Sequence, residues 1–524
     1  MSTYTKNFES LLEKKTKIIP LLLFLFAIVF LSSFVISTPT NGDTYAYAYS
    51  VKYLNGSKIH PGYYFLGHIF YFLTRLFSLS PLFTLNLISI VSGALSVFAI
   101  YLFIYKISQN LLISTISSVV LLFSGGFWFY SIYGEVYIPQ LCFVLFSILF
   151  TYYRKPFLGS LFLLVAISIT PTSVLVLPAL LFIMYRNKSD KKQFFYFIIP
   201  LIVPVLAVFV MKFSKIGDIV ELAVYSPRIF FRNFSLVSLL KKIIVDLVYV
   251  YGKSFGILNM VAILGLVFLY RYHRNLFWIM FLLIVPFTLY IFNLGLLTED
   301  HLIITFVPMS LLIACGLWWI FASAKTAKVV GMIVVLVLLA SQFWLSFEIY
   351  IFPEMKRSQI LEKTVDNFAK DFEPNAILIS DWNFGMPFWY FTQNETDYSL
   401  LTGRPVRFFQ SAGLTVKQII LRLNYSFWID IPNLPILLAN KELKSITFMN
   451  GRKVYFVEGK SQSNWLKDLL LTKGSIRYTQ IPGVRKVKIV ELMEKDFELP
   501  LQIIDSLDFP MEKIYKFKVM PAGM

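Results

Sequence analysis

Long apolar runs separated by short polar turns fill the first two thirds of the chain. A run of about 20 apolar residues can cross a bilayer as a helix. We therefore predict about eleven spans, at residues 18–38, 82–105, 111–130, 136–153, 157–171, 173–185, 194–213, 245–270, 275–294, 301–323 and 329–350. The pairs that meet near Pro139 and Pro171 are short, so each could be a broken helix or a close hairpin instead of two full spans.

The pattern changes near residue 350. Beyond it, charged residues reach an ordinary density, and short alternating runs such as residues 376–380 and 453–457 lie between turns rich in Pro and Asn. Alternation with a period of two is typical of β-strands. The sequence thus predicts a polytopic α-helical membrane domain over residues 1–350 and a small soluble α/β domain over residues 351–524.

Composition supports a membrane location and excludes some kinds of chemistry. The chain is 57% hydrophobic and only 15% charged, whereas soluble domains have about 25% charged residues. A net charge of +18 then points to a membrane surface or a lipid phosphate, so we expect membrane lipids and not nucleic acid as partners. The two cysteines, Cys142 and Cys315, lie in apolar runs, which leaves no disulfide framework and no thiolate metal cluster.

Basic residues predict which side of the membrane each loop occupies, because Lys and Arg of short loops tend to stay in the cytoplasm. If residues 60–79 lie along the outer interface without crossing, all the strongly basic short turns fall inside. These turns hold Lys106, Arg154, Lys155, Arg186, Lys188, Lys191, Lys192, Arg271, Arg274, Lys325 and Lys328. We therefore predict a multi-pass protein of the inner or plasma membrane, with a cytoplasmic N-terminus and an extracytoplasmic C-terminal domain.

Two isolated acids fall on the predicted outer side of the membrane half, which holds only eleven carboxylates. Asp43 follows the first apolar run, and Glu135 lies between two later runs among aromatic residues. Ionised groups at membrane depth are costly, so such residues tend to serve a function. Asp43 could equally be a solvated loop acid or the N-cap of a helix from Thr44 to Leu54.

Three motifs resemble those of the bacterial and archaeal membrane family related to protein O-mannosyltransferases, within the GT-C superfamily of lipid-dependent glycosyltransferases. They are Gly42-Asp43-Thr44, His60-Pro61-Gly62-Tyr63 and Gly134-Glu135-Val136-Tyr137. The family has His-Pro-Pro-Gly-Tyr and Ala-Glu-Val-Tyr at the last two, so this chain has one proline fewer and Gly134 in place of Ala. The run Glu299-Asp300-His301 resembles the family's outer loop before a late span.

The resemblance implies a GT-C-like fold and the transfer of a sugar, with inversion, from a polyprenyl phosphate donor to an acceptor at the outer membrane face. The acceptor would be a protein hydroxyl, a glycan or a lipid. A hydroxyl nucleophile needs a carboxylate that accepts its proton, a role that we assign to Asp43 with Glu135 in support.

The same reaction needs cations and acceptor contacts. The departing lipid phosphate gathers negative charge, and the candidates to stabilise it are His60, Arg228, Arg232 and Lys253. The residues that we expect at the acceptor or in the outer loops are Tyr63, Tyr137, Glu299, Asp300 and Trp389. No aspartate pair has the spacing of a metal-bound diphosphate site, so we predict no required metal and no other cofactor.

Two other classes of function fit parts of the sequence. A polytopic transporter would also have many spans and sparse charge, but it would show repeated halves and polar residues in mid-span. We find no matching halves, and the polar residues cluster at one face. In a non-catalytic scaffold or lipid-binding protein, Asp43 would be dispensable.

Overall fold

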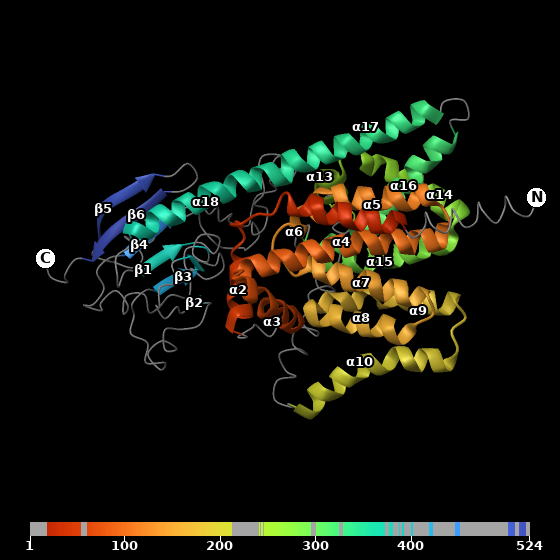
Figure 1. Ribbon diagram of the computed structural model, residues 1–524, viewed down its shortest axis with the longest axis horizontal. Helices are drawn as coiled ribbons and strands as arrows, with labels where there is room; N and C mark the ends of the chain where they lie inside the picture. The colour runs from red at the N-terminus through yellow and green to blue at the C-terminus, as the bar shows by residue number, and fades with distance from the viewer. Residues whose placement is uncertain are drawn as a thin grey trace, which may run out of the picture. The chain divides into compact units, whose positions relative to one another are not determined.

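The computed structural model divides into two compact units (Figure 1). The first comprises Met1–Ser37 and Tyr47–Met355, and the second comprises Thr38–Ala46 and Lys356–Met524. The residues that the structure describes are 18–53, 60–211, 240, 243–244, 246–294, 300–323, 328–371, 377–380, 387, 390–391, 400–401, 419–422, 446–450, 501–508 and 513–519.

Helices dominate the first unit. The helices, with short 3₁₀ and π turns labelled η, are Ile18–Ser32, α2 (Gly42–Tyr53), α3 (Pro61–Thr74), η1 (Arg75–Phe77), α4 (Pro81–Ser108), α5 (Leu111–Phe123), α6 (Gly125–Ser131), α7 (Tyr137–Tyr152), α8 (Pro156–Ile169), η2 (Pro171–Val176), α9 (Leu177–Arg186), α10 (Lys191–Met211), η3 (Asp246–Tyr251), α13 (Gly252–Phe255), α14 (Leu258–Tyr272), α15 (Arg274–Leu294), η4 (Asp300–Thr305), α16 (Phe306–Ser323), α17 (Lys328–Ser346), η5 (Phe347–Ile351) and α18 (Phe352–Asp371). Within this unit α4, α5 and α7 run side by side, and α10 packs against α8 at an edge (Figure 1).

Local sequence explains where the long helix α4 and its neighbour begin. The Ser80 hydroxyl accepts a hydrogen bond from the Phe83 N–H at 3.1 Å, and Pro81 fits the first turn, where a backbone donor has no partner within the helix. The Asn110 side chain caps α5 in the same way. The Asn110 cap, together with Gln109 in the left-handed conformation, forms the tight turn between α4 and α5, whereas the Ser80 cap lies at the other end of α4.

Aromatic packing holds the first helix, α6 and α17 together. Trp128 on α6 is fully buried. Its ring centroid lies 4.6 Å from that of Phe30 on the first helix and 5.3 Å from that of Phe343 on α17. Truncating such a side chain typically costs about 3–5 kcal/mol of stability, so this contact fixes the short helix that leads into the Glu135 loop.

Large apolar side chains cover the outside of several helices. Val329 on α17 is 67% exposed and Met260 on α14 is 68% exposed. A continuous apolar surface of this kind is stable against lipid chains and unfavourable in water. Three helices of the described part are long and apolar enough to cross a membrane, or five if each bent pair counts as one span. The chain is therefore a membrane protein.

The predicted number of eleven spans is not confirmed, although helices occupy all eleven apolar stretches. Two stretches expected to be single helices are bent: by 66° between α5 and α6, and by 100° between residues 248–255 and α14. The second bend has a direct cause, because Gly256 takes φ +56°, a conformation that side chains disfavour. Pro139 and Pro171, where the sequence suggested breaks, lie in the first turns of α7 and η2.

Helix α3 lies across one end of the bundle and does not traverse it. The Asn86 side chain, near the start of α4, donates a hydrogen bond to the Ile36 carbonyl just beyond the first helix. The end of the first helix therefore lies beside the start of α4. Helix α3 approaches the end of α8 at Gly62 and the start of α4 at Gly67. The position of residues 60–79 along the outer interface stays a prediction.

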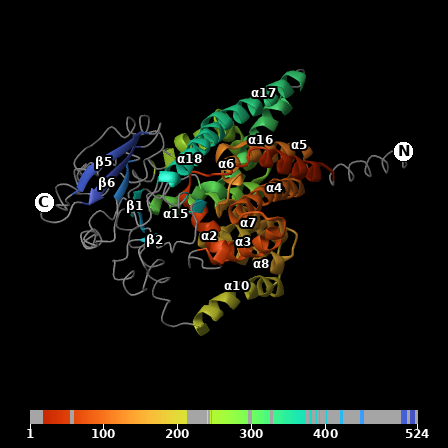
Figure 2. The same cartoon turned by 60° about the vertical axis from the view of Figure 1, so that its left-hand side comes forward.

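The second unit contains a six-stranded mixed sheet, two strands of which are seen side by side in Figure 2. Its strands are β1 (Ile377–Ser380), β2 (Leu400–Leu401), β3 (Ile419–Arg422), β4 (Ile446–Asn450), β5 (Leu501–Asp508) and β6 (Lys513–Val519). Their order is β2-β3-β1-β4-β6-β5. The pairs among β1, β2, β3 and β4 are parallel, whereas β6 pairs antiparallel with both β4 and β5.

The topology predicts opposite labelling of two introduced cysteines. Cys142 and Cys315 are buried, so a new thiol at an exposed turn reports its own accessibility. Ser78→Cys follows η1 at the α3 end of the bundle, and Lys188→Cys follows α9. In intact cells a membrane-impermeant maleimide should label Ser78→Cys at once and Lys188→Cys only after permeabilisation. The reverse result would invert the orientation.

Candidate active site

The loop between α6 and α7 places Glu135 at one end of the helical bundle, where the residue is only 2% exposed. One side chain on α4 holds this loop. Asn86 Oδ1 accepts a hydrogen bond from the Gly134 N–H at 2.7 Å, and Asn86 Nδ2 donates to the Ile36 carbonyl at 3.0 Å. Ser89, one turn further along α4, accepts from the Glu135 N–H at 3.4 Å. The backbone around the carboxylate is therefore fixed from α4.

Gly134 lets the loop approach α4 closely. A Cβ added at this position would lie 2.5 Å from the Leu85 Cβ, well inside van der Waals contact. The Ala that the resembled family has here would push the loop away from Asn86. Glycine is thus required by this packing, which accounts for the departure from the Ala-Glu-Val-Tyr motif.

Tyrosines surround Glu135. Burial raises the pKa of the Tyr63 hydroxyl well above its usual range, and the Glu135 carboxylate raises it further. Burial also raises the pKa of the Tyr133 hydroxyl, followed by smaller contributions from Tyr130, Glu135, Glu354 and Asp300. Both phenols stay protonated at neutral pH, so they can donate hydrogen bonds but cannot act as bases.

Two further acids lie within electrostatic reach of Tyr133. Asp300 begins η4 and is 8% exposed, and Glu354 on α18 is 4% exposed. The Asp300 carboxylate contacts His301 Nδ1 at 3.0 Å, and the His301 ring packs on Tyr137 with centroids 5.3 Å apart. The Tyr137 hydroxyl interacts in turn with Asp300 and Glu135. Four of the site residues predicted from the sequence therefore lie close together: Glu135, Tyr63, Tyr137 and Asp300.

Lys253 lies at the same end of the bundle, on α13. Its Nζ stands 4.3 Å from the centroid of the Tyr350 ring. Tyr350 packs against Phe129 at 6.0 Å, and Phe129 packs against Tyr133 at 4.9 Å. Two ring contacts therefore connect this cation to the tyrosines around Glu135.

His60 is oriented by a backbone carbonyl. Its Nδ1 lies 2.7 Å from the Ile169 carbonyl oxygen at the end of α8. A carbonyl can only accept, so Nδ1 carries the proton and a second donor at Nε2 requires the charged ring. The Tyr47 ring lies 6.0 Å from His60 and 5.4 Å from Tyr63, which places the histidine beside the tyrosines.

Asp43 belongs to the second unit. Its side chain is exposed, and its backbone N–H donates to Asn41 Oδ1 at 3.1 Å. Asn41, the residue before α2, therefore occupies the N-cap position, which was one of the roles predicted for Asp43. In the same unit, the Tyr45 ring packs on Tyr390 and Phe391 with centroids 5.5 and 5.8 Å apart, which ties the Asp43 segment to the C-terminal part of the chain.

Four other residues that the sequence selected lie outside the described residues: Arg228, Arg232, Glu299 and Trp389. Among the residues that the structure does describe, no group of three or more His, Cys, Asp or Glu side chains is arranged to hold a metal ion.

Several residues of this cluster were not predicted from the sequence. Asn86 could have been identified from the sequence, since it is the one amide side chain in the apolar helix α4. A polar residue at membrane depth tends to be functional. Glu354 and Tyr350 could not have been identified in this way, because they lie at or beyond the predicted domain boundary at residue 350. In the structure, α17, η5 and α18 continue across that boundary. Only the fold brings these two beside α6.

Replacing Asn86 tests whether it holds the loop. Asn86→Ala leaves the Gly134 N–H and the Ile36 carbonyl without their buried partner, at a cost of about 1–3 kcal/mol in the free energy of unfolding. We expect faster hydrogen–deuterium exchange over residues 132–136. Ser96→Ala is the control, because the Ser96 hydroxyl bonds to the Ser92 carbonyl of its own helix at 2.8 Å. Equal exchange in the two variants would contradict the role of Asn86.

No family model matches the chain, and no curated protein matches it in sequence. Solved structures do match. ArnT from Cupriavidus metallidurans in the apo state superposes with a TM-score of 0.55 and 9% identity over 96% of this chain and 98% of that chain. The same protein bound to undecaprenyl phosphate gives a TM-score of 0.54 and 8% identity over 96% and 97%.

A third match is the archaeal oligosaccharyltransferase AglB from Archaeoglobus fulgidus, in complex with an inhibitory peptide and a dolichol-phosphate, with a TM-score of 0.49 and 11% identity over 82% of this chain and 69% of that chain. The likeness to ArnT extends over nearly the full length of both chains, so it describes the whole architecture. The chain therefore shares the fold of ArnT over nearly its whole length.

Proposed function

We propose that this protein is a membrane glycosyltransferase that moves a sugar from a polyprenyl-phosphate donor to an acceptor at the outer membrane face, with inversion at the anomeric carbon. The observation that carries the proposal is the fold shared with ArnT, a protein solved with undecaprenyl phosphate bound. The buried Glu135 loop and the tyrosines around it supply polar groups at one end of the bundle.

The chemistry assigns a role to each charged group. An acceptor hydroxyl attacks the anomeric carbon while its proton passes to the Asp43 carboxylate, and the bond between that carbon and the phosphate oxygen breaks. The lipid phosphate leaves with the bonding electrons. Charged His60 and Lys253 stabilise it, with Arg228 and Arg232 as further cations.

The remaining polar residues suit the acceptor. Glu135, fixed from α4, orients the acceptor or polarises the sugar. Tyr63, Tyr137 and Asp300 lie around it as hydrogen-bonding groups. Glu299 and Trp389 are proposed acceptor contacts from sequence position alone, and we propose that the reaction needs no metal. The acceptor is a protein hydroxyl, a glycan or a lipid.

A transporter is the competing function. Transport needs polar groups that line a path through the spans. In α4, α5 and α16, the hydroxyls of Ser96, Ser117, Ser118 and Ser310 instead bond to the carbonyl one turn earlier in their own helix. Glu135, Asp300 and Glu354 gather at one end of the bundle, which suits a surface reaction better than a path.

The finer arrangement follows from the sequence. We propose about eleven spans within residues 1–350 as the catalytic membrane domain, with residues 351–524 as a soluble α/β domain outside the cell membrane. The N-terminus then lies in the cytoplasm. The mixed sheet of the second unit supports the α/β part of this arrangement.

The base assignment predicts a large loss of turnover in Asp43→Asn, which preserves shape but removes the proton acceptor. General base catalysis is typically worth about 10²- to 10⁴-fold, so the rate constant for sugar transfer should fall by that factor while donor binding stays nearly unchanged. Asp190→Asn is the matched control, an aspartate whose side chain caps the first turn of α10 by accepting from Gln193 at 2.7 Å. Wild-type transfer by Asp43→Asn would remove the assignment.

The phosphate role of His60 predicts a different defect. His60→Ala should raise the dissociation constant of the polyprenyl-phosphate sugar, because one cation at the phosphate is lost. His68→Ala is the control: it lies on α3, the helix that His60 precedes, and its Nδ1 bonds to a backbone carbonyl, that of Val51, at 2.8 Å. Titration of each purified variant with the donor measures the two dissociation constants. Equal affinities would show that His60 does not contact the donor.

A further inference from the structure

A second polar cavity lies at the opposite end of the bundle from Glu135. It has a volume of about 350 Å³ and is formed where α4, α7, α9 and α14 end and α15 begins. Along α4, eighteen residues separate Ser89, beside Glu135, from Ile107 in the cavity wall, which at 1.5 Å per residue is about 27 Å. The cavity is therefore separate from the candidate active site.

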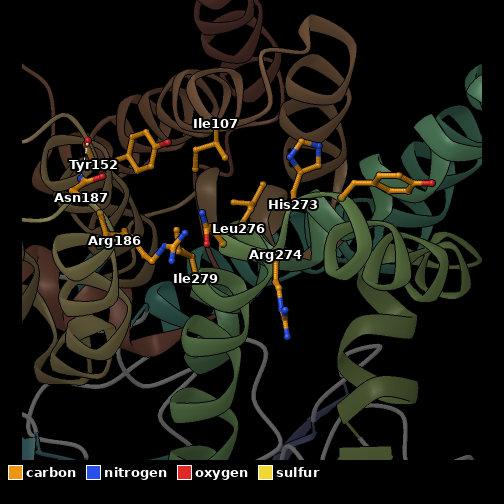
Figure 3. Close-up of a pocket in the computed structure, with 11 residues that line it drawn as sticks. Ile107, Tyr152, Arg186, Asn187, His273, Arg274, Leu276 and Ile279 are labelled. Atoms are coloured by element: carbon orange, nitrogen blue, oxygen red, sulfur yellow. Dashed lines mark hydrogen bonds between the residues drawn. The ribbon is translucent and has the colours of Figure 1, made fainter.

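The cavity wall favours an anion. Figure 3 shows Arg186 and Asn187 on one side and His273 on the other, with Leu276 between them. None of the eleven described lining residues is acidic. Arg186 forms no ion pair with any residue that the structure describes, so its charge is available to a ligand.

The start of α15 adds backbone donors. Arg274, Asn275 and Leu276 line the cavity and form the first turn of this 21-residue helix, whose N–H groups have no acceptor within the helix. The Arg274 side chain extends away from the other lining residues in Figure 3, and its Cζ lies 5.5 Å from the centroid of the Tyr270 ring. Its guanidinium contributes charge at the rim.

Opposing charge comes from the carboxyl ends of α4, α7 and α9, whose terminal carbonyls carry partial negative charge. Asn187 offsets part of it, because its Nδ2 donates to the Thr151 and Tyr152 carbonyls at 3.4 and 3.2 Å. The same two bonds hold the end of α9 against the end of α7. The cavity is thereby shaped before any ligand arrives.

The surroundings place the cavity at the depth of lipid headgroups. Exposed aromatic residues stand at this end of the helices, with Tyr185 72% exposed, Tyr272 56% and Trp278 38%. Tyr and Trp gather at the level of the membrane–water interface. The inner wall is apolar, formed by Ile107, Ile183 and Ile279. A ligand with a phosphate and an adjoining acyl chain fits both features.

We propose that this cavity binds a phosphate group, supplied by the headgroup of an anionic lipid in the leaflet opposite the candidate active site. Basic pockets between helices at a membrane surface suit anionic headgroups, since each Arg near the surface contributes to the attraction. A bound headgroup would join the α9–α10 connection to the α14–α15 connection. It would stabilise the folded bundle without taking part in sugar transfer.

The test uses the full-length protein in nanodiscs of phosphatidylcholine alone or doped with phosphatidylglycerol. Ligand that binds only the folded state raises the melting temperature. We expect phosphatidylglycerol to raise the melting temperature of the wild type. Arg186→Gln should weaken lipid binding by roughly 5-fold, and Arg186→Gln with Arg274→Gln by roughly 30-fold. Both variants carry changes only at exposed positions, so folding should survive.

Arg271→Gln is the matched control. It removes the same charge from the last turn of α14 but lies outside the cavity lining. If Arg271→Gln loses as much lipid affinity as Arg186→Gln, the effect is general surface charge and the proposal fails. A parallel arm adds inorganic phosphate to phosphatidylcholine nanodiscs. Stabilisation there that depends on Arg186, with no preference for phosphatidylglycerol, would keep the phosphate site but overturn the lipid as its source.

Discussion

The buried carboxylate of Glu135 imposes the main constraint on the helical unit. A carboxyl group with 2% exposure requires fixed polar neighbours, because burying a polar group without partners costs about 1–3 kcal/mol or more. Asn86 and Ser89 hold the backbone, and buried tyrosines with raised pKa values lie within electrostatic reach of the side chain. The close packing of Gly134 on Leu85 and of Trp128 on Phe30 then serves to keep this polar group in place.

The two ends of the helical unit differ in charge. Acids gather at the end that carries Glu135, Asp300 and Glu354, whereas arginines line the cavity at the other end. Between them, hydroxyls inside the spans bond to their own helices, as the Ser117 hydroxyl does with the Ile113 carbonyl. The bundle thus separates two polar regions by a layer in which polar groups are satisfied within their own helices.

Periodicity and charge bias were enough to predict much of this fold. Apolar runs located helices in all eleven stretches, and the basic turns at Lys106, Arg154, Arg186 and Arg274 do lie at helix ends that meet around one cavity. The bends were not predictable from hydropathy, because a bend at Gly256 leaves the apolar run unbroken. The site was found only in part. Glu135 was recognised because it lies in a motif. Glu354 was not, because a π turn and a helix beyond the predicted boundary bring it to the site.

The most direct test of the account follows the donor itself. Purified protein is incubated with a polyprenyl-phosphate sugar of defined anomeric configuration and with membrane extract as the source of acceptor, and the product linkage is determined by NMR. The account predicts release of polyprenyl phosphate together with a new glycoside of the opposite anomeric configuration. Donor that moves between the leaflets of a vesicle but remains chemically intact would contradict it and would identify the protein as a carrier.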